Sequence, residues 1–182
     1  RGQYDAPREV FWASGACMLV RSEVFRRLGG FDGDFFAHME EIDFCWRAQL
    51  AGYRIRVEPR STVFHVGGGT LPNNSPQKIY LNFRNNLCML FKNLSPGTFW
   101  PVLFSRMVLD GMAALVFLVQ GHPDFFKKVF RAHIDFHRQR KSLHEKRRAI
   151  QRHRVARPHG ILRNSIILLH AFGYRTFDKV MR

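Results

Sequence analysis

Three acidic side chains stand close together in one short stretch of the sequence and could act on a hydroxyl group. Glu40, Glu41 and Asp43 lie within residues 35–47, among Phe, Met and Trp side chains. A carboxylate withdrawn from water by such neighbours is a stronger base, and enzymes make general bases for neutral pH in this way. We therefore expect one of these acids to deprotonate a hydroxyl, while a neighbouring acid and Arg47 hold the segment in place.

The same acids also have a purely structural explanation. They fall at the start of a helix expected over residues 40–51, where carboxylates complement the helix dipole. Asp43 lies four residues before Arg47, which is the spacing of an ordinary ion pair within a helix. On spacing alone, both explanations stay open.

His65 is the candidate metal ligand. It ends a strand-like segment, residues 62–66, directly before three consecutive glycines, and α/β sheets present functional groups where a strand opens onto such a loop. A neutral imidazole can bind Mn²⁺-type cations, but a lone His in this place is more often structural. The three glycines match no phosphate-binding motif, and the three Cys residues lack metal-binding spacing.

Two kinds of structure are expected to position these residues. Residues 9–20 indicate a buried strand in which Ser14, Gly15 and Ala16 let a group approach the backbone closely. The remaining expected elements are strands over 53–57 and 62–66, and helices over 23–28, 40–51, 77–94, 101–120, from 123 to about 155, and 161–172. A boundary near residues 67–76 separates an α/β part from an all-helical part.

The charge is divided unevenly between the two parts. The 182 residues carry a formal net charge of +15, yet residues 1–70 hold nine basic and nine acidic side chains, so all of the excess lies in residues 71–182. This division suggests chemistry in the first part and attachment to an anionic partner in the second. Residues 101–120 approach membrane-spanning length but are interrupted by Arg106 and Asp110. The 46% hydrophobic content excludes a chain disordered throughout.

Five blocks of the first part resemble, in order and spacing, the second half of the family 2 inverting glycosyltransferases of GT-A fold, in particular the rhamnosyltransferase-like group. The blocks are FWASGACMLVR at 11–21, LGGFD at 28–32, FFAHMEEIDFCWR at 35–47, AGYRI at 51–55 and VFH at 63–65. The resemblance covers residues 4–70 and extends more loosely over the helical remainder. It implies an α/β fold: the C-terminal half of a GT-A, Rossmann-like domain over residues 1–70, then a basic, mostly α-helical region over 71–182.

The resemblance also implies roles for the acidic segment. Glu41 takes the place of the general base that deprotonates the acceptor hydroxyl, and Glu40 that of its partner. Asp43 and Arg47 are expected to brace the helix. The implied reaction transfers a sugar, as a hexosyltransferase does, from a nucleotide-sugar donor to a hydroxyl of a glycan or lipid-linked acceptor, with inversion.

Substrate and metal positions follow from the same resemblance. Trp12, Ser14 and Gly15 are expected near the sugar, and His65 matches a position that helps to bind a divalent cation, Mn²⁺ or Mg²⁺. The family's donor-binding half, with its Asp-x-Asp motif, precedes this segment. We therefore expect the chain to be a fragment that by itself neither binds nucleotide sugar tightly nor turns over.

The basic helical part is expected to lie on an anionic membrane. Together with the resemblance, this indicates a cytoplasmic protein, peripheral at the inner face of the cell membrane and active in cell-envelope polysaccharide biosynthesis. The alternative is a non-catalytic basic module that binds nucleic acid or an anionic membrane. The neutral first 70 residues and the absence of any nucleic-acid-binding motif disfavour nucleic acid.

Overall fold

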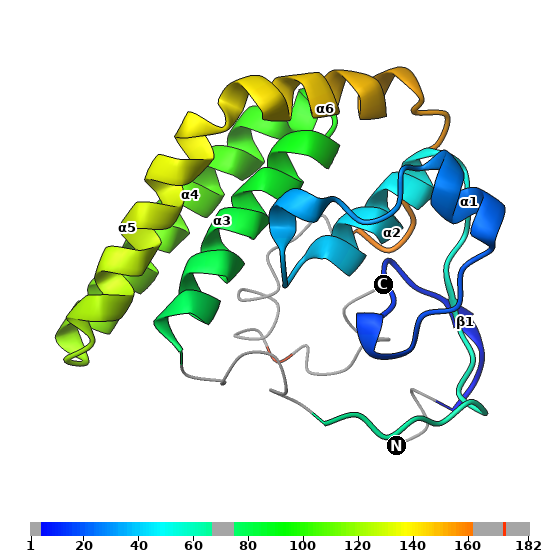
Figure 1. Ribbon diagram of the computed structural model, residues 1–182, viewed down its shortest axis with the longest axis horizontal. Helices are drawn as coiled ribbons and strands as arrows, with labels where there is room; N and C mark the ends of the chain where they lie inside the picture. Colours follow the sequence, from blue (N-terminus) through cyan, green and yellow to red (C-terminus); the bar gives the residue numbers. More distant parts are fainter. Residues whose placement is uncertain (1–4, 67–74, 162–172, 174–182) are drawn as a thin grey trace.

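The structure, a computed structural model, describes residues 5–66, 75–161 and 173. Figure 1 shows α3, α4 and α5 side by side, α6 across their upper end, and α1, α2 and β1 on the opposite side of the molecule. In chain order the elements are β1 (Arg8–Glu9), the 3-10 turn η1 (Gly15–Cys17), α1 (Ser22–Arg27), the 3-10 turn η2 (Gly33–Phe35), α2 (Glu40–Leu50), β2 (Arg56–Val57), α3 (Pro76–Asn93), α4 (Pro96–Val119), α5 (Pro123–Arg138) and α6 (Arg140–Arg152).

The helices begin and end close to the residues that the sequence marks as caps. The Ser75 hydroxyl accepts a hydrogen bond from the backbone N–H of Lys78 at the start of α3. Gly52 follows α2 with a φ of 90°, a left-handed conformation that ends helices. The helices expected over 40–51 and 77–94 are therefore confirmed.

Two helix expectations need correction. Helix α4 begins at Pro96 rather than at Pro101, which lies inside the helix. The long basic helix expected from residue 123 is divided at Gln139 into α5 and α6, which leave in different directions (Figure 1). Because the chain changes direction at Gln139, α5 and α6 both pack against α3, which also contacts α4.

The main core lies around α3. The ring of Phe91 makes edge-to-face contacts with Phe99 of α4, Phe136 of α5 and His144 of α6, at centroid distances of 5.2, 5.7 and 4.9 Å. Leu87, one turn earlier, is fully buried. Edge-to-face aromatic pairs add to the stabilisation that burial provides, so one residue of α3 ties three helices together.

In the described part of the chain, the strand expected over 53–57 is confirmed only at its end, by β2, and the strand expected over 62–66 does not form. The long buried strand expected over 9–20 is wrong apart from Glu9, which belongs to β1. The sheet of the described residues consists of β1 and β2, which pair antiparallel over two residues each. Leu19 and Phe64 are fully exposed. A buried strand takes hydrogen bonds and apolar cover from neighbours. Beyond Val10, whose N–H donates to the carbonyl of Ile55, no strand of the described chain pairs with residues 11–20 or with residues 62–66. The expected boundary at 67–76 and the apolar piece at 161–172 fall largely outside the described residues.

Candidate functional site

An ion pair fixes helix α2, which carries the four charged residues of the predicted site. Arg47 Nε donates to Asp43 Oδ2 at 2.8 Å, and the Asp43 side chain is fully buried. The other two guanidinium nitrogens donate to the backbone carbonyls of Leu28 and Gly30, at 2.6 and 2.7 Å. Because the pair also bonds the loop after α1, it holds α2 against that loop.

A second set of charges joins α2 to α3 and α6. Asp43 Oδ1 accepts from Asn93 at 2.8 Å and lies 3.0 Å from the ammonium group of Lys92, which is itself buried. Lys92 also contacts Asp32, at 2.6 Å, and so does Lys146 of α6, at 2.5 Å. Burial alone would raise the pKa of the Asp32 carboxyl, but the two ammonium groups lower it to about 2.

The turn before α2 has a strained backbone. Phe36, His38 and Met39 have φ values of 62°, 67° and 73°, in the region that favours glycine. Each such residue costs on the order of 1–3 kcal/mol and persists only where its surroundings impose it. The turn leads directly into Glu40 and Glu41, so whatever holds it also places these acids.

Asn85 of α3 holds this turn. Its side chain is fully buried. Arg84 donates to the Asn85 side-chain oxygen through Nε and Nη2, at 2.9 and 2.7 Å, which directs the amide nitrogen toward the turn. That nitrogen is within hydrogen-bond distance of three carbonyl oxygens, those of Phe35, Ala37 and His38, at 2.9, 2.8 and 2.8 Å.

The two acids at the start of α2 are only half-buried, and each keeps one oxygen free of protein partners. Glu40 Oε2 and Glu41 Oε2 are shielded from water and form no hydrogen bond with the described residues. Glu41 lies against Gly15, where an added Cβ would be 3.6 Å from Glu41 Cβ. Buried polar atoms are normally paired, so the unpaired carboxylate oxygens of Glu40 and Glu41 can accept a hydrogen bond from a ligand.

The segment predicted to contact the sugar lies beside Glu41. Ser14 begins η1, and its hydroxyl accepts from the backbone N–H of Ala16 at 3.3 Å. Trp12 is 42% exposed. The structure thus brings Gly15 to Glu41 and keeps Trp12 and Ser14 on the same short segment.

The side chain of Gln49 in α2 holds the segment that precedes η1 in place. Its amide nitrogen donates to the carbonyl of Phe11 at 2.8 Å, and its amide oxygen accepts from the backbone N–H of His159 at 2.6 Å. The residues that follow α6 are therefore tied to the residues that precede η1 through one side chain.

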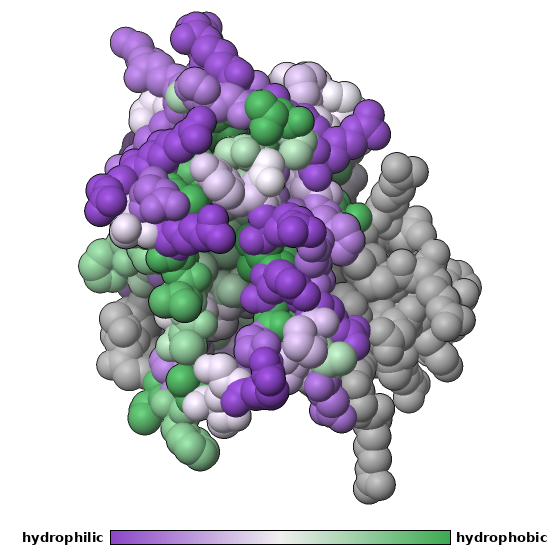
Figure 2. Space-filling view, turned by 90° about the vertical axis from the view of Figure 1, so that its right-hand side faces the viewer, coloured by the Kyte–Doolittle hydropathy of each residue, from purple (hydrophilic) through white to green (hydrophobic). Residues whose placement is uncertain are grey.

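An open apolar groove of about 1170 Å³ lies between η1, α1 and β2. Met18, Val24, Phe44 and Ile55 contribute to its walls. Figure 2 views the molecule from the right-hand side of Figure 1 and shows hydrophobic side chains open to solvent among hydrophilic ones. The groove runs beside the acids rather than over them, since neither Glu40 nor Glu41 lines it.

The structure does not place His65 in a metal site. Its side chain is exposed, and the described residues contain no group of three or more His, Cys, Asp or Glu side chains that could hold a metal ion. A divalent cation normally needs several oxygen or nitrogen ligands. The described residues therefore do not fit the expected cation by themselves.

Sequence reasoning missed the residues of α3 that support the site. Asn85, Lys92 and Asn93 were included in the helix expected over 77–94 without a role. A signal exists: Leu81, Asn85, Cys88 and Lys92 follow helical spacing on one buried face. Polar residues on an otherwise apolar stripe indicate buried partners, although spacing alone does not identify those partners.

Comparison with known proteins relates the first part of the chain to a known family. Residues 2–74 match the family described as glycosyl transferase family group 2. This segment is therefore similar to family 2 glycosyltransferases of the rhamnosyltransferase-like kind, which confirms the resemblance seen over residues 4–70. No solved structure matches the chain.

The similar proteins include three glycosyltransferases. The rhamnosyltransferase WbbL of Escherichia coli is 43% identical over 56 residues, which are 31% of this chain and 21% of that protein. The N-acetylglucosaminyl-diphospho-decaprenol L-rhamnosyltransferase of Mycobacterium tuberculosis is 41% identical over 58 residues, 32% of this chain and 19% of that protein. A low-salt glycan biosynthesis hexosyltransferase of Haloferax volcanii is 31% identical over 79 residues, 43% and 26% of the two chains. The match thus spans about a fifth to a quarter of each relative.

Proposed function

We propose that this chain supplies the acceptor side and the general base of an inverting sugar transfer from a nucleotide-sugar donor to a hydroxyl of a glycan or lipid-linked acceptor. The observation that carries the proposal is the free, shielded oxygen of Glu41 at the start of a rigidly held helix. The side-chain carbons of Glu41 lie against Gly15. The relatives named above transfer rhamnose or another hexose, which supports a hexosyl donor.

The reaction follows from this placement. The acceptor hydroxyl donates a hydrogen bond to Glu41 Oε2, and the carboxylate takes the proton as the oxygen attacks the anomeric carbon. The new carbon–oxygen bond forms on the face opposite the bond that breaks, and the nucleoside diphosphate leaves with that bond's electron pair. The configuration is therefore inverted.

Neighbouring residues have supporting roles in the proposal. Glu40 is the partner acid of Glu41, and the buried Asp43–Arg47 pair keeps α2 from moving as the proton arrives. Trp12, exposed beside η1, offers an aromatic face to the sugar.

The donor-binding part is proposed to lie in a complete enzyme of GT-A fold. The open apolar groove beside η1 and the exposed Leu19 and Phe64 are surfaces that such a part could cover. The expected divalent cation, with His65 as one ligand, belongs to that complete enzyme as well. Its remaining ligands would have to come from outside the described residues.

The test is Glu41→Gln in the complete enzyme that contains this segment. We expect the turnover rate to fall by about 10²–10⁴-fold, because a general base contributes that much, while donor binding measured by calorimetry stays unchanged. Glu58→Gln is the matched control, since Glu58 is exposed and, among the described residues, its side chain forms hydrogen bonds with Arg60 alone. Full turnover by Glu41→Gln with loss of turnover by Glu40→Gln would move the base to Glu40.

A further inference from the structure

Helix α4 leaves one long side uncovered. Its inner side packs against α3 and α5 through Phe99, Leu103 and Ala114, which are buried. The opposite side, called here the outer face of α4, consists of large apolar side chains that are 48% to 89% exposed: Trp100, Phe104, Val108, Met112, Leu115 and Val119. At 24 residues the helix is about 36 Å long, so this is a continuous apolar surface of the kind that marks a contact site.

The two charges that interrupt α4 in the sequence do not reach this face. Arg106 Nε lies 2.7 Å from Asp110 Oδ1, and Asp110 is buried. The other Asp110 oxygen lies 3.1 Å from His133 Nε2 of α5. Both charged residues are therefore ion-paired away from the outer face, and every exposed residue of α4 is uncharged.

The polar residues on the outer side of α4 are also satisfied within the helix. The Ser105 hydroxyl donates to the Pro101 carbonyl at 2.7 Å, and Ser95 and Thr98 share a hydrogen bond of 2.8 Å. Transfer of this side into an apolar medium would break none of these bonds. The usual cost of burying polar groups without partners is thereby avoided.

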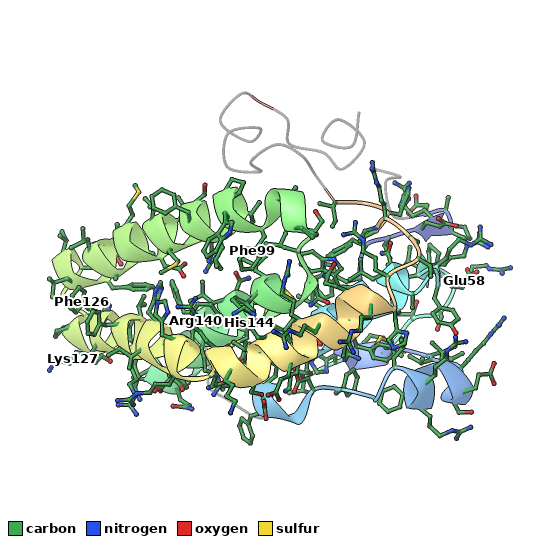
Figure 3. All side chains as sticks on the ribbon, turned by 90° about the horizontal axis from the view of Figure 1, so that it is seen from above. Glu58, Phe99, Phe126, Lys127, Arg140 and His144 are labelled. Atoms are coloured by element: carbon green, nitrogen blue, oxygen red, sulfur yellow. The ribbon has the colours of Figure 1, made fainter. Side chains whose placement is uncertain are left out.

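The apolar surface continues onto α5 and is bordered by basic residues. Phe126 and Phe130 lie seven and three residues before His133, which touches α4, so helical spacing puts them on the flank of α5 that faces α4. Phe130 is 64% exposed. Lys127 follows Phe126 and Arg131 follows Phe130, so both basic residues lie on the adjacent side of α5. Figure 3 shows Phe126 between the ends of α4 and α5 and Lys127 on the far side of α5.

From this surface and its basic border we infer that the outer face of α4 lies in the surface of an anionic lipid bilayer. Trp100, Phe104 and Leu115 enter the boundary between headgroups and acyl chains, and the exposed cations of α5 and α6 face the acidic headgroups. Such surface binding adds buried apolar area to the attraction between basic side chains and anionic lipid. The inference does not depend on the proposed sugar transfer.

The helix lies along the bilayer rather than across it. By length and composition α4 could span a membrane, and 17% of its most apolar window is buried within the protein. However, α5 packs along α4 and is joined to it by the His133–Asp110 contact. A spanning α4 would carry Lys127 and Arg131 of α5 toward the hydrocarbon, where charges cost several kcal/mol each.

The first experiment measures binding of the chain to vesicles by co-sedimentation. We expect binding to vesicles of phosphatidylcholine and phosphatidylglycerol, and weaker binding to phosphatidylcholine alone. The double variant Phe104→Glu, Leu115→Glu should bind more than about tenfold more weakly, because it puts charge in place of buried apolar area. Val155→Glu is the matched control, since Val155 is 77% exposed and lies outside α4; it should bind like the wild type. Thermal melts establish that each variant is folded.

Two further measurements test separately the attraction of basic side chains to the lipid and the insertion of the outer face of α4. Lys127 of α5 and Lys141 of α6 are exposed. Lys127→Gln with Lys141→Gln should weaken binding to anionic vesicles by about 25-fold at low salt, at about a fivefold loss per basic residue. Lipids with brominated chains should quench the fluorescence of the wild type, and Trp100→Phe should remove most of that quenching although Trp12 and Trp46 remain.

Three outcomes would overturn the inference. One is equal vesicle binding by the wild type and the Phe104→Glu, Leu115→Glu variant, which would put the lipid contact elsewhere. Another is a wild-type dimer in analytical ultracentrifugation that this variant dissociates, which would make a second copy the occupant of the face. The third is binding to single-stranded RNA at physiological salt with no binding to anionic vesicles.

Discussion

Replacement of Asn85 by Asp tests whether α3 imposes the strained turn that carries the two acids. The substitution keeps the size of the side chain and the oxygen that accepts from Arg84. It exchanges the amide nitrogen, which lies 2.8–2.9 Å from three carbonyl oxygens, for a second oxygen. Acceptors would then face acceptors in a fully buried position.

The expected loss follows from these contacts. A buried polar group left without its partner costs about 1–3 kcal/mol, and the two amide hydrogens of Asn85 serve three carbonyls. We expect the free energy of unfolding to fall by about 3 kcal/mol, which lowers Tm by about 6–12 °C in a chain of this size. Asn85→Ala should cost slightly less, because it leaves the carbonyls unpaired without adding repulsion.

Thermal denaturation followed by circular dichroism measures this loss, and hydrogen exchange locates it. Exchange should accelerate first in residues 36–43, since the strain of Phe36, His38 and Met39 is released when the clamp is lost. Asn86→Ala is the matched control, because the Asn86 side-chain oxygen has no partner among the described residues. The reasoning is refuted if Asn85→Asp melts within about 2 °C of the wild type, which is under 1 kcal/mol, or if Asn86→Ala is equally unstable.

Three further results are expected. The pKa of Asp32 is lowered from 3.8 to about 2, so its stabilising contribution is complete above pH 4 and is lost as the pH falls toward 2, which should cost about 2 kcal/mol in acid denaturation experiments. Arg47→Lys should lower the free energy of unfolding by about 2–4 kcal/mol, because one ammonium group cannot replace three directed hydrogen bonds; chemical denaturation measures this. A thiol reagent should modify Cys17 in the native protein, since it is exposed, and leave Cys45 and Cys88 unmodified, since they are buried and burial raises the pKa of both thiols, that of Cys88 to about 12.

Each of these has its own control. In the Asp32→Asn variant, the free energy of unfolding should depend much less on pH between pH 4 and 2. Arg54→Lys, at an exposed position, should change Tm by less than about 2 °C. All three thiols should react after unfolding in denaturant, and two modified thiols in the native protein would show that the buried ones open readily.

The helices could be predicted from the sequence, and the reason lies in local signals. Ser75 and Pro76 mark the start of α3, and Gly52 follows the end of α2. These residues act on their own backbone, so a local pattern contains the information. The break at Gln139 escaped prediction because no Pro or Gly marks it, and the change of direction comes from packing on α3.

The strands and the supports of the site could not be predicted in the same way. Residues 9–20 have the apolar run of a buried strand, but a strand forms only where another strand is within reach. In the described chain β2 reaches only the start of this run, at Glu9 and Val10, and no strand pairs with residues 11–20. Asn85 meets residues 35–38 across about fifty positions of sequence. The acids themselves were found because they follow one another in the chain. Their role as base and partner stays a prediction.

The contact of Gln49 with His159 sets the order in which the protein can form during synthesis. The hydrogen bond between Gln49 and the backbone of His159 can form only after a further 110 residues have been synthesised. The contact between Asp32 and Lys146 likewise requires a further 114 residues. At the usual speed of translation this interval lasts roughly 5–20 s. Until it ends, the nascent chain has α2 without its last supports. A chaperone that binds apolar segments therefore has its best opportunity in this interval, and the segment that faces Glu41 is among the last to be fixed.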